Sequence, residues 1–252
     1  MKKFLLVLLM IGLVVCLLAG CSGVTPPPGE EEDEEEDEGE GEEEVSRVVL
    51  VELFTSHCPF CKIVEPLLEE VAEEYERTEM VLVEIGTWGD AITVGGNDRY
   101  KWYLPDSIQR TTPNTLLNGS NQRIWKVASK DSFKSLINIE LAKEAIISIE
   151  VSKTENSGSV TLSGSIKNIS TSSLDNLVIN GMIFKDNSIT GEKYMVSKII
   201  KDTTEDGITL ASEAEQSFEF VLEELSWAYN VNGVIFVQDS STKEILQAIY
   251  VE

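Results

Sequence analysis

The sequence predicts an α/β domain over residues 45–143, followed by an all-β sandwich domain over residues 144–252. In the first part, two continuous apolar segments flank a segment with helical spacing, which is the pattern of a strand–helix–strand unit in a parallel sheet. After about Lys143, apolar residues recur at every second position and turn clusters separate short segments, as in a β-sandwich. With 252 residues, the chain is long enough for both domains.

The strand–helix–strand unit begins at Val48–Phe54, where an almost unbroken apolar run indicates a strand buried on both faces. A helix is predicted from Cys58 to about Arg77, because its apolar side chains fall on one side and its glutamates on the other. A second buried strand follows at Met80–Ile85. A unit of this kind is right-handed almost without exception.

The α/β domain is predicted to end with a hairpin and a helix. Short strands at Asn114–Leu117 and Arg123–Val127 flank a turn rich in Asn and Gly, which is a strong hairpin signal. Asp131 or Ser132 is placed to cap a last amphipathic helix that reaches Leu141.

The sandwich is predicted from short segments with a period of two, and it contains no cysteine that could join its sheets. The predicted strands are Ile146–Lys153, Ser159–Asn168, Leu177–Lys185, Lys193–Ile200, Glu215–Glu223, Gly233–Gln238 and Ile245–Val251.

The N-terminus has the pattern of an export signal. Lys2 and Lys3 precede an apolar run, and Leu18-Ala19-Gly20-Cys21 resembles the bacterial lipobox. That resemblance implies a lipoprotein signal peptide over residues 1–20, lipidation of Cys21, and a place in the cell envelope on the extracytoplasmic side of the membrane. The alternative is an uncleaved transmembrane anchor, although the apolar run is shorter than the ~20 residues of a spanning helix.

Residues 21–44 comprise the lipidated cysteine and a linker that we expect to be disordered, since it contains few apolar residues. Residues 30–44 include 13 acidic residues. We interpret the linker as a spacer that holds the folded part away from the membrane, with binding of calcium or of a cationic wall polymer as alternatives. The formal net charge of −24 argues against a nucleic-acid partner, because such binding requires Lys and Arg at the phosphates.

Cys58 and Cys61 are the only cysteines left once Cys16 is removed with the signal peptide and Cys21 is lipidated. A CxxC pair performs redox chemistry or binds metal. Its position after a strand and at the start of a helix favours redox chemistry, because helix N-termini stabilise a thiolate. Cys58 would then attack and Cys61 would resolve the mixed disulfide. Zinc prefers four ligands, and the single histidine is His57, so we expect neither a metal nor a cofactor.

The run from Val48 to Tyr75 resembles the active-site segment of thioredoxins, and Arg110-Thr111-Thr112-Pro113 resembles their cis-proline loop. The resemblance implies a thioredoxin-like fold for residues 45–143, with Pro113 in cis beside the cysteines. It also implies that Thr112 offers backbone hydrogen bonds to a substrate. Glu52 falls where the family has a buried acid that relays the proton of the resolving thiol; alternatively, Glu52 is a tolerated polar residue at a strand edge.

Some positions depart from the thioredoxin pattern. His57 replaces a tryptophan, and the dipeptide between the cysteines is Pro59-Phe60. We expect these residues to tune the reduction potential, with His57 either stabilising the thiolate or lying exposed in a loop. The C-terminal segment from Val231 to Ala248 is similar to the sandwich domain of Omp28-type envelope proteins, which implies an immunoglobulin-like architecture.

These features together predict a membrane-anchored thiol–disulfide oxidoreductase that acts on protein cysteines. Reduction is favoured slightly over oxidation or isomerisation, and a reductase would need a membrane electron-transfer thiol oxidoreductase as its partner. Two alternatives stay open. The cysteine pair has lost its redox role, or the protein is a non-catalytic envelope binding or adhesion lipoprotein in which the sandwich acts and the thioredoxin-like domain is a scaffold.

Overall fold

The computed structural model describes residues 45–56, 58–88, 92–119, 122–156, 158–185, 193–201, 207–223 and 231–252. The predicted signal peptide, Cys21, the acidic linker and His57 lie outside the described residues. Within the described part of the chain, no helix is long and apolar enough to cross a membrane.

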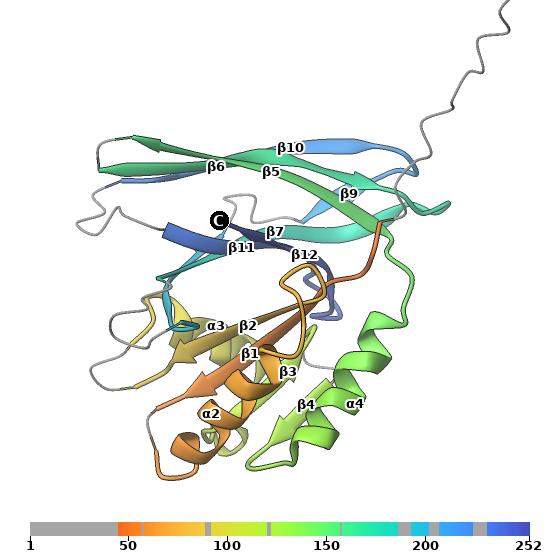
Figure 1. Ribbon diagram of the computed structural model, residues 1–252. Helices are drawn as coiled ribbons and strands as arrows, with labels where there is room; N and C mark the ends of the chain where they lie inside the picture. Colours follow the sequence, from red (N-terminus) through yellow and green to blue (C-terminus); the bar gives the residue numbers. More distant parts are fainter. Residues whose placement is uncertain are drawn as a thin grey trace, which may run out of the picture. The chain divides into compact units, whose positions relative to one another are not determined.

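The first part of the chain forms a mixed four-stranded sheet with the strand order β2-β1-β3-β4. Its strands are β1 (Val49–Thr55), β2 (Met80–Gly86), β3 (Asn114–Leu117) and β4 (Gln122–Trp125). β1 pairs with β2 in parallel, whereas β3 is antiparallel to both β1 and β4. The helices α2 (Cys61–Ala72) and α4 (Lys130–Leu141) lie on one side of this sheet (Figure 1). The connection from β2 to β3 holds α3 (Gly96–Tyr103) and the 3-10 helix η1 (Ser107–Gln109).

β1 is buried along its whole length, as its apolar sequence predicts. Val49, Val51 and Leu53 contribute to the core beneath α2 and α4, while Leu50 and Phe54 belong to a different core on the opposite face of the sheet. This alternation follows from the period of two along a strand. It leaves Glu52 on the same face as Leu50 and Phe54, away from the α2 core.

Three predicted boundaries in this part need correction. α2 begins at Cys61 rather than Cys58 and ends at Ala72, because the next two backbone bonds, from Glu74 to Val71 and from Tyr75 to Ala72, tighten into a turn. β4 ends at Trp125, since Lys126 has a left-handed φ of 74° that no strand continues.

The cap of α4 is Ser129, not Asp131 or Ser132. Ser129 has an extended backbone, and its side chain accepts a hydrogen bond from the Ser132 amide at 3.2 Å. Asp131 and Ser132 fall inside the first turn of the helix, so they cannot occupy the capping position.

The second part of the chain forms two antiparallel sheets. One has the order β10-β6-β5, and the other has the order β12-β11-β7-β8 with β9 also paired to β7. The strands are β5 (Ile147–Asn156), β6 (Ser159–Asn168), β7 (Leu174–Lys185), β8 (Val196–Lys201), β9 (Ile208–Leu210), β10 (Glu215–Leu222), β11 (Val231–Asp239) and β12 (Ile245–Val251). Each predicted strand is present; β9 was not predicted, because three residues are too few to show a period.

The central sheet of the second part is buried on both faces. Met182, Phe184, Val234 and Phe236 join the core that also contains Leu50 and Phe54 of β1. Their neighbours Ile183, Ile235 and Val237 join a separate core against the β10-β6-β5 sheet. The sheets therefore stack in three layers, with α2 and α4 beyond the mixed sheet (Figure 1).

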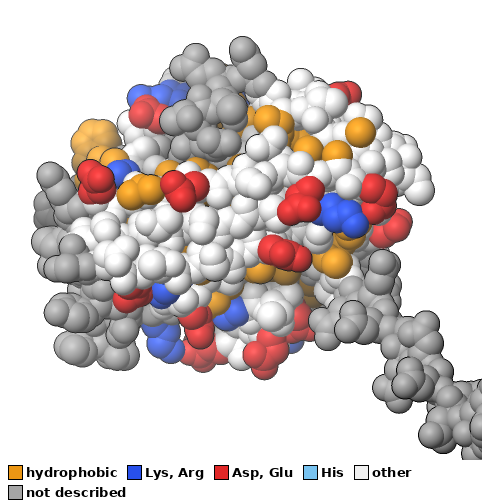
Figure 2. All heavy atoms as spheres, turned by 90° about the horizontal axis from the view of Figure 1, so that it is seen from above, with side chains coloured by type: hydrophobic (Ala, Val, Ile, Leu, Met, Phe, Trp, Pro, Cys, Tyr) orange, Lys and Arg blue, Asp and Glu red, His pale blue; other side chains and the backbone are white. Residues whose placement is uncertain are grey.

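The outer face of the β10-β6-β5 sheet is largely polar. Figure 2 views the molecule from this side and shows mainly uncharged surface with scattered acidic side chains and a few apolar ones. A single buried face per strand explains the clean alternation in β10, whose burial changes with every residue from Phe218 to Leu222.

Candidate redox site

Cys58 and Cys61 form a disulfide where the turn after β1 leads into α2, and their Cα atoms are 4.9 Å apart. Cys58 is partly exposed in the turn, whereas Cys61 is the first residue of α2 and has 0% exposure. The outer sulfur is thus accessible to a partner protein and the inner one is not. This difference suits an attacking Cys58 and a resolving Cys61.

The start of α2 stabilises negative charge on Cys58. The Cys61 amide nitrogen lies 3.1 Å from Cys58 Sγ and points its N–H at it. After reduction, this N–H can donate to a Cys58 thiolate, and the free amide groups of the first turn of α2 favour the same charge. Surroundings of this kind favour the thiolate form of a cysteine.

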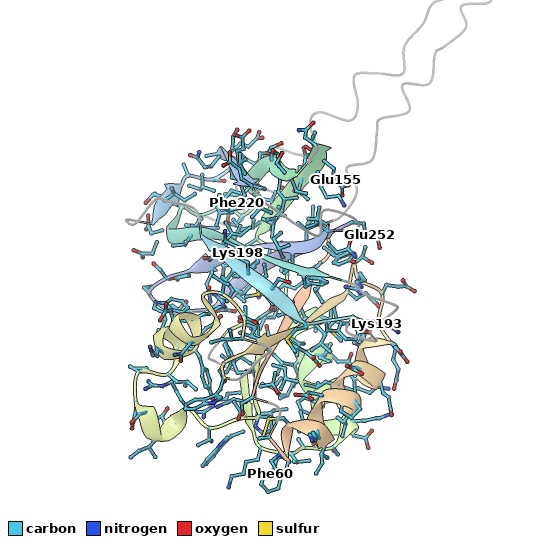
Figure 3. The ribbon with its side chains drawn as sticks, turned by 90° about the vertical axis from the view of Figure 1, so that its left-hand side faces the viewer. Phe60, Glu155, Lys193, Lys198, Phe220 and Glu252 are labelled. Carbon is cyan, nitrogen blue, oxygen red and sulfur yellow. A yellow bond between two sulfur atoms is a disulfide. The ribbon has the colours of Figure 1, made fainter. Side chains whose placement is uncertain are left out.

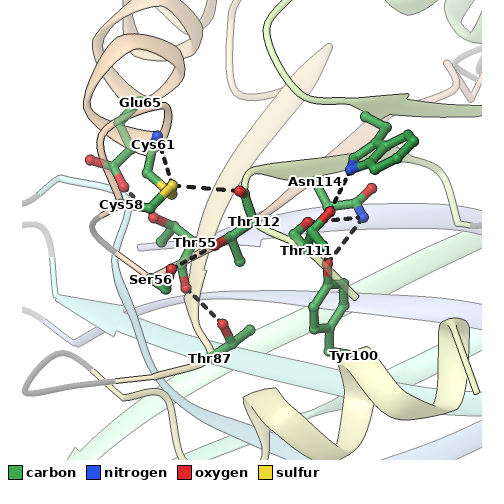
Figure 4. The surroundings of a disulfide bond; sticks show 11 residues. Thr55, Ser56, Cys58, Cys61, Glu65, Thr87, Tyr100, Thr111, Thr112 and Asn114 are labelled. Carbon is green, nitrogen blue, oxygen red and sulfur yellow. Dashed lines mark hydrogen bonds between the residues drawn. A yellow bond between two sulfur atoms is a disulfide. The ribbon is translucent and has the colours of Figure 1, made fainter. Parts of the chain in front are cut away.

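The structure brings Thr112 and Pro113 to the disulfide, although they are more than fifty residues away in sequence. The Thr112–Pro113 peptide bond is cis. The Thr112 carbonyl oxygen lies 3.5 Å from Cys58 Sγ, and the Thr112 hydroxyl shares a hydrogen bond of 2.5 Å with the Ser56 hydroxyl (Figure 4). The arrangement is the one that the thioredoxin resemblance implies; that Thr112 binds substrate stays a prediction.

Pro59 and Phe60 are both exposed, and Phe60 has 59% of its surface accessible. Figure 3 shows Phe60 at the end of the folded part opposite to Glu155 and Phe220 of the second part. The disulfide therefore lies at an end of the molecule where a large partner can approach. The influence of Pro59 and Phe60 on the potential is untested.

Glu52 is fully buried in a polar network on the other face of the mixed sheet. Its carboxylate accepts hydrogen bonds from Arg99 Nε at 2.5 Å, Arg99 Nη2 at 3.0 Å and the Tyr103 hydroxyl at 2.7 Å. Gln238 of β11 donates to the Tyr103 hydroxyl at 2.7 Å and accepts from Arg99 at 3.2 Å. β1 is an interior strand, so Glu52 does not lie at a strand edge.

Burial and charge act against each other in this network. Burial alone would lower the pKa of Arg99, but the Glu52 carboxylate and Tyr103 hydroxyl outweigh it, so the pKa of Arg99 is raised. Burial also raises the pKa of Tyr103 well above its ordinary value, despite the opposing effect of Arg99. Arg99 therefore stays charged and Tyr103 stays neutral at physiological pH. The proton-relay role of Glu52 remains a prediction. Its carboxylate accepts three hydrogen bonds from Arg99 and Tyr103.

Sequence reasoning missed several residues around the disulfide. The Glu65 side chain accepts a hydrogen bond from the Thr55 hydroxyl, and Trp125 Nε1 donates to Thr111 Oγ1 at 2.5 Å. Glu65 follows Cys61 by four residues in α2, so helical spacing could have identified it. Arg99 gave no such signal, because it lies in α3, which the sequence did not predict.

Within the described residues, no three His, Cys, Asp or Glu side chains are placed to hold a metal ion.

Comparison with known proteins supports the fold only. No family model and no curated protein matches the sequence. HBP35 of Porphyromonas gingivalis has a similar structure, with 13% sequence identity, a TM-score of 0.63, and coverage of 82% of this chain and 75% of that one. A protein of Agrobacterium tumefaciens is 15% identical with a TM-score of 0.44, covering 81% of this chain and 94% of that one.

A thioredoxin-like superfamily protein, SPOA0173, is also among the structural neighbours. It is 15% identical, covers 39% of this chain and 83% of that one, and has a TM-score of 0.30. The last two scores are too low to carry an argument. The likeness to HBP35 indicates that the two chains share a fold.

Proposed function

We propose that residues 45–143 form a thioredoxin-like domain and that the protein is a thiol–disulfide oxidoreductase for protein cysteines. The observation that carries the proposal is the position of the disulfide. The accessible Cys58 sulfur lies between the Cys61 amide, at 3.1 Å, and the Thr112 carbonyl, at 3.5 Å. One side stabilises a thiolate, and the other offers a backbone acceptor to an extended substrate.

In the reducing direction, the reaction begins with both cysteines as thiols. The Cys58 thiolate attacks one sulfur of a client disulfide, a Cys58–client bond forms, and the second client sulfur leaves as a thiolate. Cys61 then loses its proton to solvent or a nearby base and attacks Cys58 Sγ. The Cys58–Cys61 bond forms and the first client sulfur is released, so the client gains two electrons. A reducing dithiol protein must return two electrons before the next cycle.

The setting of this reaction is also part of the proposal. The lipobox-like segment supports lipidation of Cys21 and a place on the extracytoplasmic side of the membrane, where the electrons would come from a membrane thiol oxidoreductase. Reduction remains slightly favoured because the local sequence is most similar to thioredoxins.

Cysteine variants test the proposal. Wild-type protein with dithiothreitol as reductant should reduce a peptide disulfide, and Cys58→Ser should lower that rate to the uncatalysed background. Cys61→Ser should trap clients in cells as mixed disulfides on Cys58, and a Cys58→Ser/Cys61→Ser variant should trap none. The reduction potential of the pair, measured against glutathione, then determines the direction. The proposal fails if the wild-type protein exchanges with no disulfide or dithiol.

A further inference from the structure

We propose that a basic surface beside the disulfide, formed by Arg110, Arg123, Trp125 and Lys126, binds an extended client segment that carries an acidic side chain near its reactive cysteine. This inference rests on the proposed redox function and names its substrate class. Three properties of this surface support the proposal: it lies near the disulfide, it is positively charged, and its cations are held in place.

The basic surface adjoins the reactive sulfur. Thr112, whose carbonyl oxygen lies 3.5 Å from Cys58 Sγ, is preceded in the chain by Thr111, whose hydroxyl accepts the Trp125 indole N–H at 2.5 Å. Figure 4 shows Thr112 next to the disulfide and Thr111 beyond it, close to Asn114 and Tyr100. Trp125 is the last residue of the edge strand β4 and has 51% of its surface exposed. A chain that passes Thr112 in an extended conformation therefore reaches Trp125 next.

Among the residues that the structure describes, the cations of this surface have no carboxylate partner. Arg110 donates to the carbonyl oxygens of Leu104 and Pro105, and Arg123 donates to Asn114 Oδ1 and the Gln109 carbonyl. Neutral acceptors orient a guanidinium without cancelling its charge. Within the described residues, neither arginine nor Lys126 forms an ion pair. Lysines elsewhere on the surface do form them: Lys101 with Asp98, Lys130 with Glu70, Lys134 with Glu74, Lys153 with Glu155 and Lys193 with Glu73.

The charge of the surface is opposite to that of the whole chain, whose formal net charge is −24. Asp106, in the same loop as Arg110, directs its carboxylate to the Ile108 amide and forms no ion pair with Arg110. A local positive field on an acidic protein attracts an acidic partner, and it does so next to the reacting sulfur.

The aromatic ring holds the cations in place. Lys126 Nζ lies 4.5 Å from the centroid of the Trp125 ring, and Arg123 Cζ lies 5.9 Å from it. Cation–π contacts of this kind order the charged groups before a ligand arrives. The remaining exposed face of Trp125 can cover the apolar stem of a client Glu or Asp while its carboxylate meets the cations. Because Thr111, which bonds to Trp125, directly precedes Thr112 at the disulfide, and an extended chain advances ~3.3 Å per residue, the acidic residue should lie within a few residues of the client cysteine.

Three peptides with one cysteine each test the inference. They share one apolar sequence, carry Glu, Gln or Lys three residues from the cysteine, and are linked through that cysteine to thionitrobenzoate. Attack by reduced protein at the peptide sulfur releases the coloured thiolate, and its absorbance yields the second-order rate constant. We expect the Glu peptide to react about tenfold faster than the Lys peptide at low salt, with the Gln peptide between them. The difference should shrink at 0.5 M salt, because ions screen exposed charges.

Variants locate the effect. The Arg123→Gln/Lys126→Gln protein should react with the three peptides at nearly equal rates. Lys126→Gln alone should show part of this loss; the side chain is exposed, and the backbone bond from the Lys126 amide to the Pro113 carbonyl, at 3.3 Å, is kept in this variant. The matched control Lys101→Gln removes an exposed cation from α3 and should retain the full preference. Equal rates with the Glu and Gln peptides in the wild-type protein would overturn the inference, as would a preference that survives in the double variant.

Hydroxyethyl disulfide separates this inference from the redox function. The compound is small and neutral, so it does not sense the basic surface, and its reduction by the wild-type protein reports the redox function alone. If the wild-type protein reduces it and the peptides show no charge preference, the redox function stands and the client preference is wrong. If the wild-type protein reduces neither this compound nor any peptide, the proposed function itself has failed.

Discussion

At the scale of single residues, Glu52 and Arg99 form a buried ion pair on the second face of the mixed sheet. Both side chains are almost fully buried, with 0% and 2% exposure, and Tyr103 and Gln238 complete their hydrogen bonds. A buried charge without its partner is far more costly than a buried pair. Replacing one member of the pair is therefore expected to destabilise the fold more than replacing both.

We predict that Arg99→Leu lowers the free energy of unfolding by about 3–5 kcal/mol, because it leaves the Glu52 carboxylate buried without its cation. The Glu52→Leu/Arg99→Leu variant should recover a large part of this loss, since it removes both charges. Urea unfolding of the two variants and the wild type measures the difference. An equal loss in the single and the double variant would contradict the argument.

Asp239 links stability to pH at the turn between β11 and β12. Its carboxylate accepts hydrogen bonds from the Ser241 hydroxyl and the Ser241 amide, both at 2.7 Å, and from the Thr242 amide at 3.1 Å. Burial alone would raise the pKa of Asp239, but these hydrogen bonds outweigh it and the pKa is lowered. The ionised form is thus favoured by folding, so its contribution is complete above the ordinary carboxyl pKa of 3.8 and is lost as the pH falls through the lower folded value.

The expected result for Asp239→Asn is a loss of about 1 kcal/mol at pH 7, which becomes smaller below about pH 4 as the wild-type carboxylate takes up its proton. Urea midpoints measured from pH 3 to pH 7 provide the check. Glu219→Gln, at an exposed position of β10, is the control and should show no such trend. A difference from wild type that does not depend on pH would refute the assignment.

At the scale of elements, the start of α4 depends on one side chain. Ser129 caps the helix through the Ser132 amide, and Phe133 and Ile137 then bury the apolar face of the helix against the mixed sheet. The cap satisfies an amide that the helix itself leaves without a partner.

Ser129→Ala should therefore lower the free energy of unfolding by about 1 kcal/mol, which is the usual cost of removing such a cap. Ser135→Ala is the matched control: Ser135 is exposed within the same helix, where alanine is the better helix former, so this change should be neutral or slightly stabilising. Thermal or urea unfolding decides between the outcomes. A similar effect at both positions would show that Ser129 is not acting as the cap.

At the scale of the whole molecule, the two parts of the chain share buried contacts across the predicted boundary at residues 143–144. Leu50 and Phe54 of the first part share a core with Met182 and Phe236 of the second. Backbone and side-chain bonds cross as well: Arg47 donates to the Ile245 carbonyl at 2.9 Å, and the Ile245 amide donates to the Asn118 carbonyl at 3.0 Å. These apolar side chains are buried only while the two parts stay together, so separating the parts would expose them to water.

We predict that residues 45–252 unfold in one transition. Labelling of the reduced Cys61 thiol reports on the first part, where this side chain is buried. Far-UV circular dichroism reports mainly on the second part, which contains most of the strands. Both signals should have the same urea midpoint. Phe236→Ala should lower both midpoints together, because the lost side chain belongs to the shared core. Two separated transitions, or a shift in only one of them, would show that the parts unfold independently.

The sequence predicted the elements around the site well because their signals are local. Continuous apolar runs located β1 and β2, and apolar alternation located the strands of the second part. The CxxC pair was expected at the junction of a strand and a helix, where it lies. α3 and β9 escaped prediction for a physical reason. α3 carries polar and aromatic residues without a clear apolar stripe, and β9 has only three residues.

By itself, then, the sequence predicted most of the strands and helices and the position of the CxxC pair between β1 and α2, since periodicity, turn chemistry and motif spacing act over a few residues. Only the tertiary structure decided that Glu52 pairs with Arg99 and that β7 and β11 are buried on both faces. It also decided that Trp125 and its neighbouring cations lie beside the disulfide. These contacts join residues that are far apart in the chain. Local sequence patterns cannot identify such partners, because the residues meet only when tertiary packing buries their charges and apolar surfaces together.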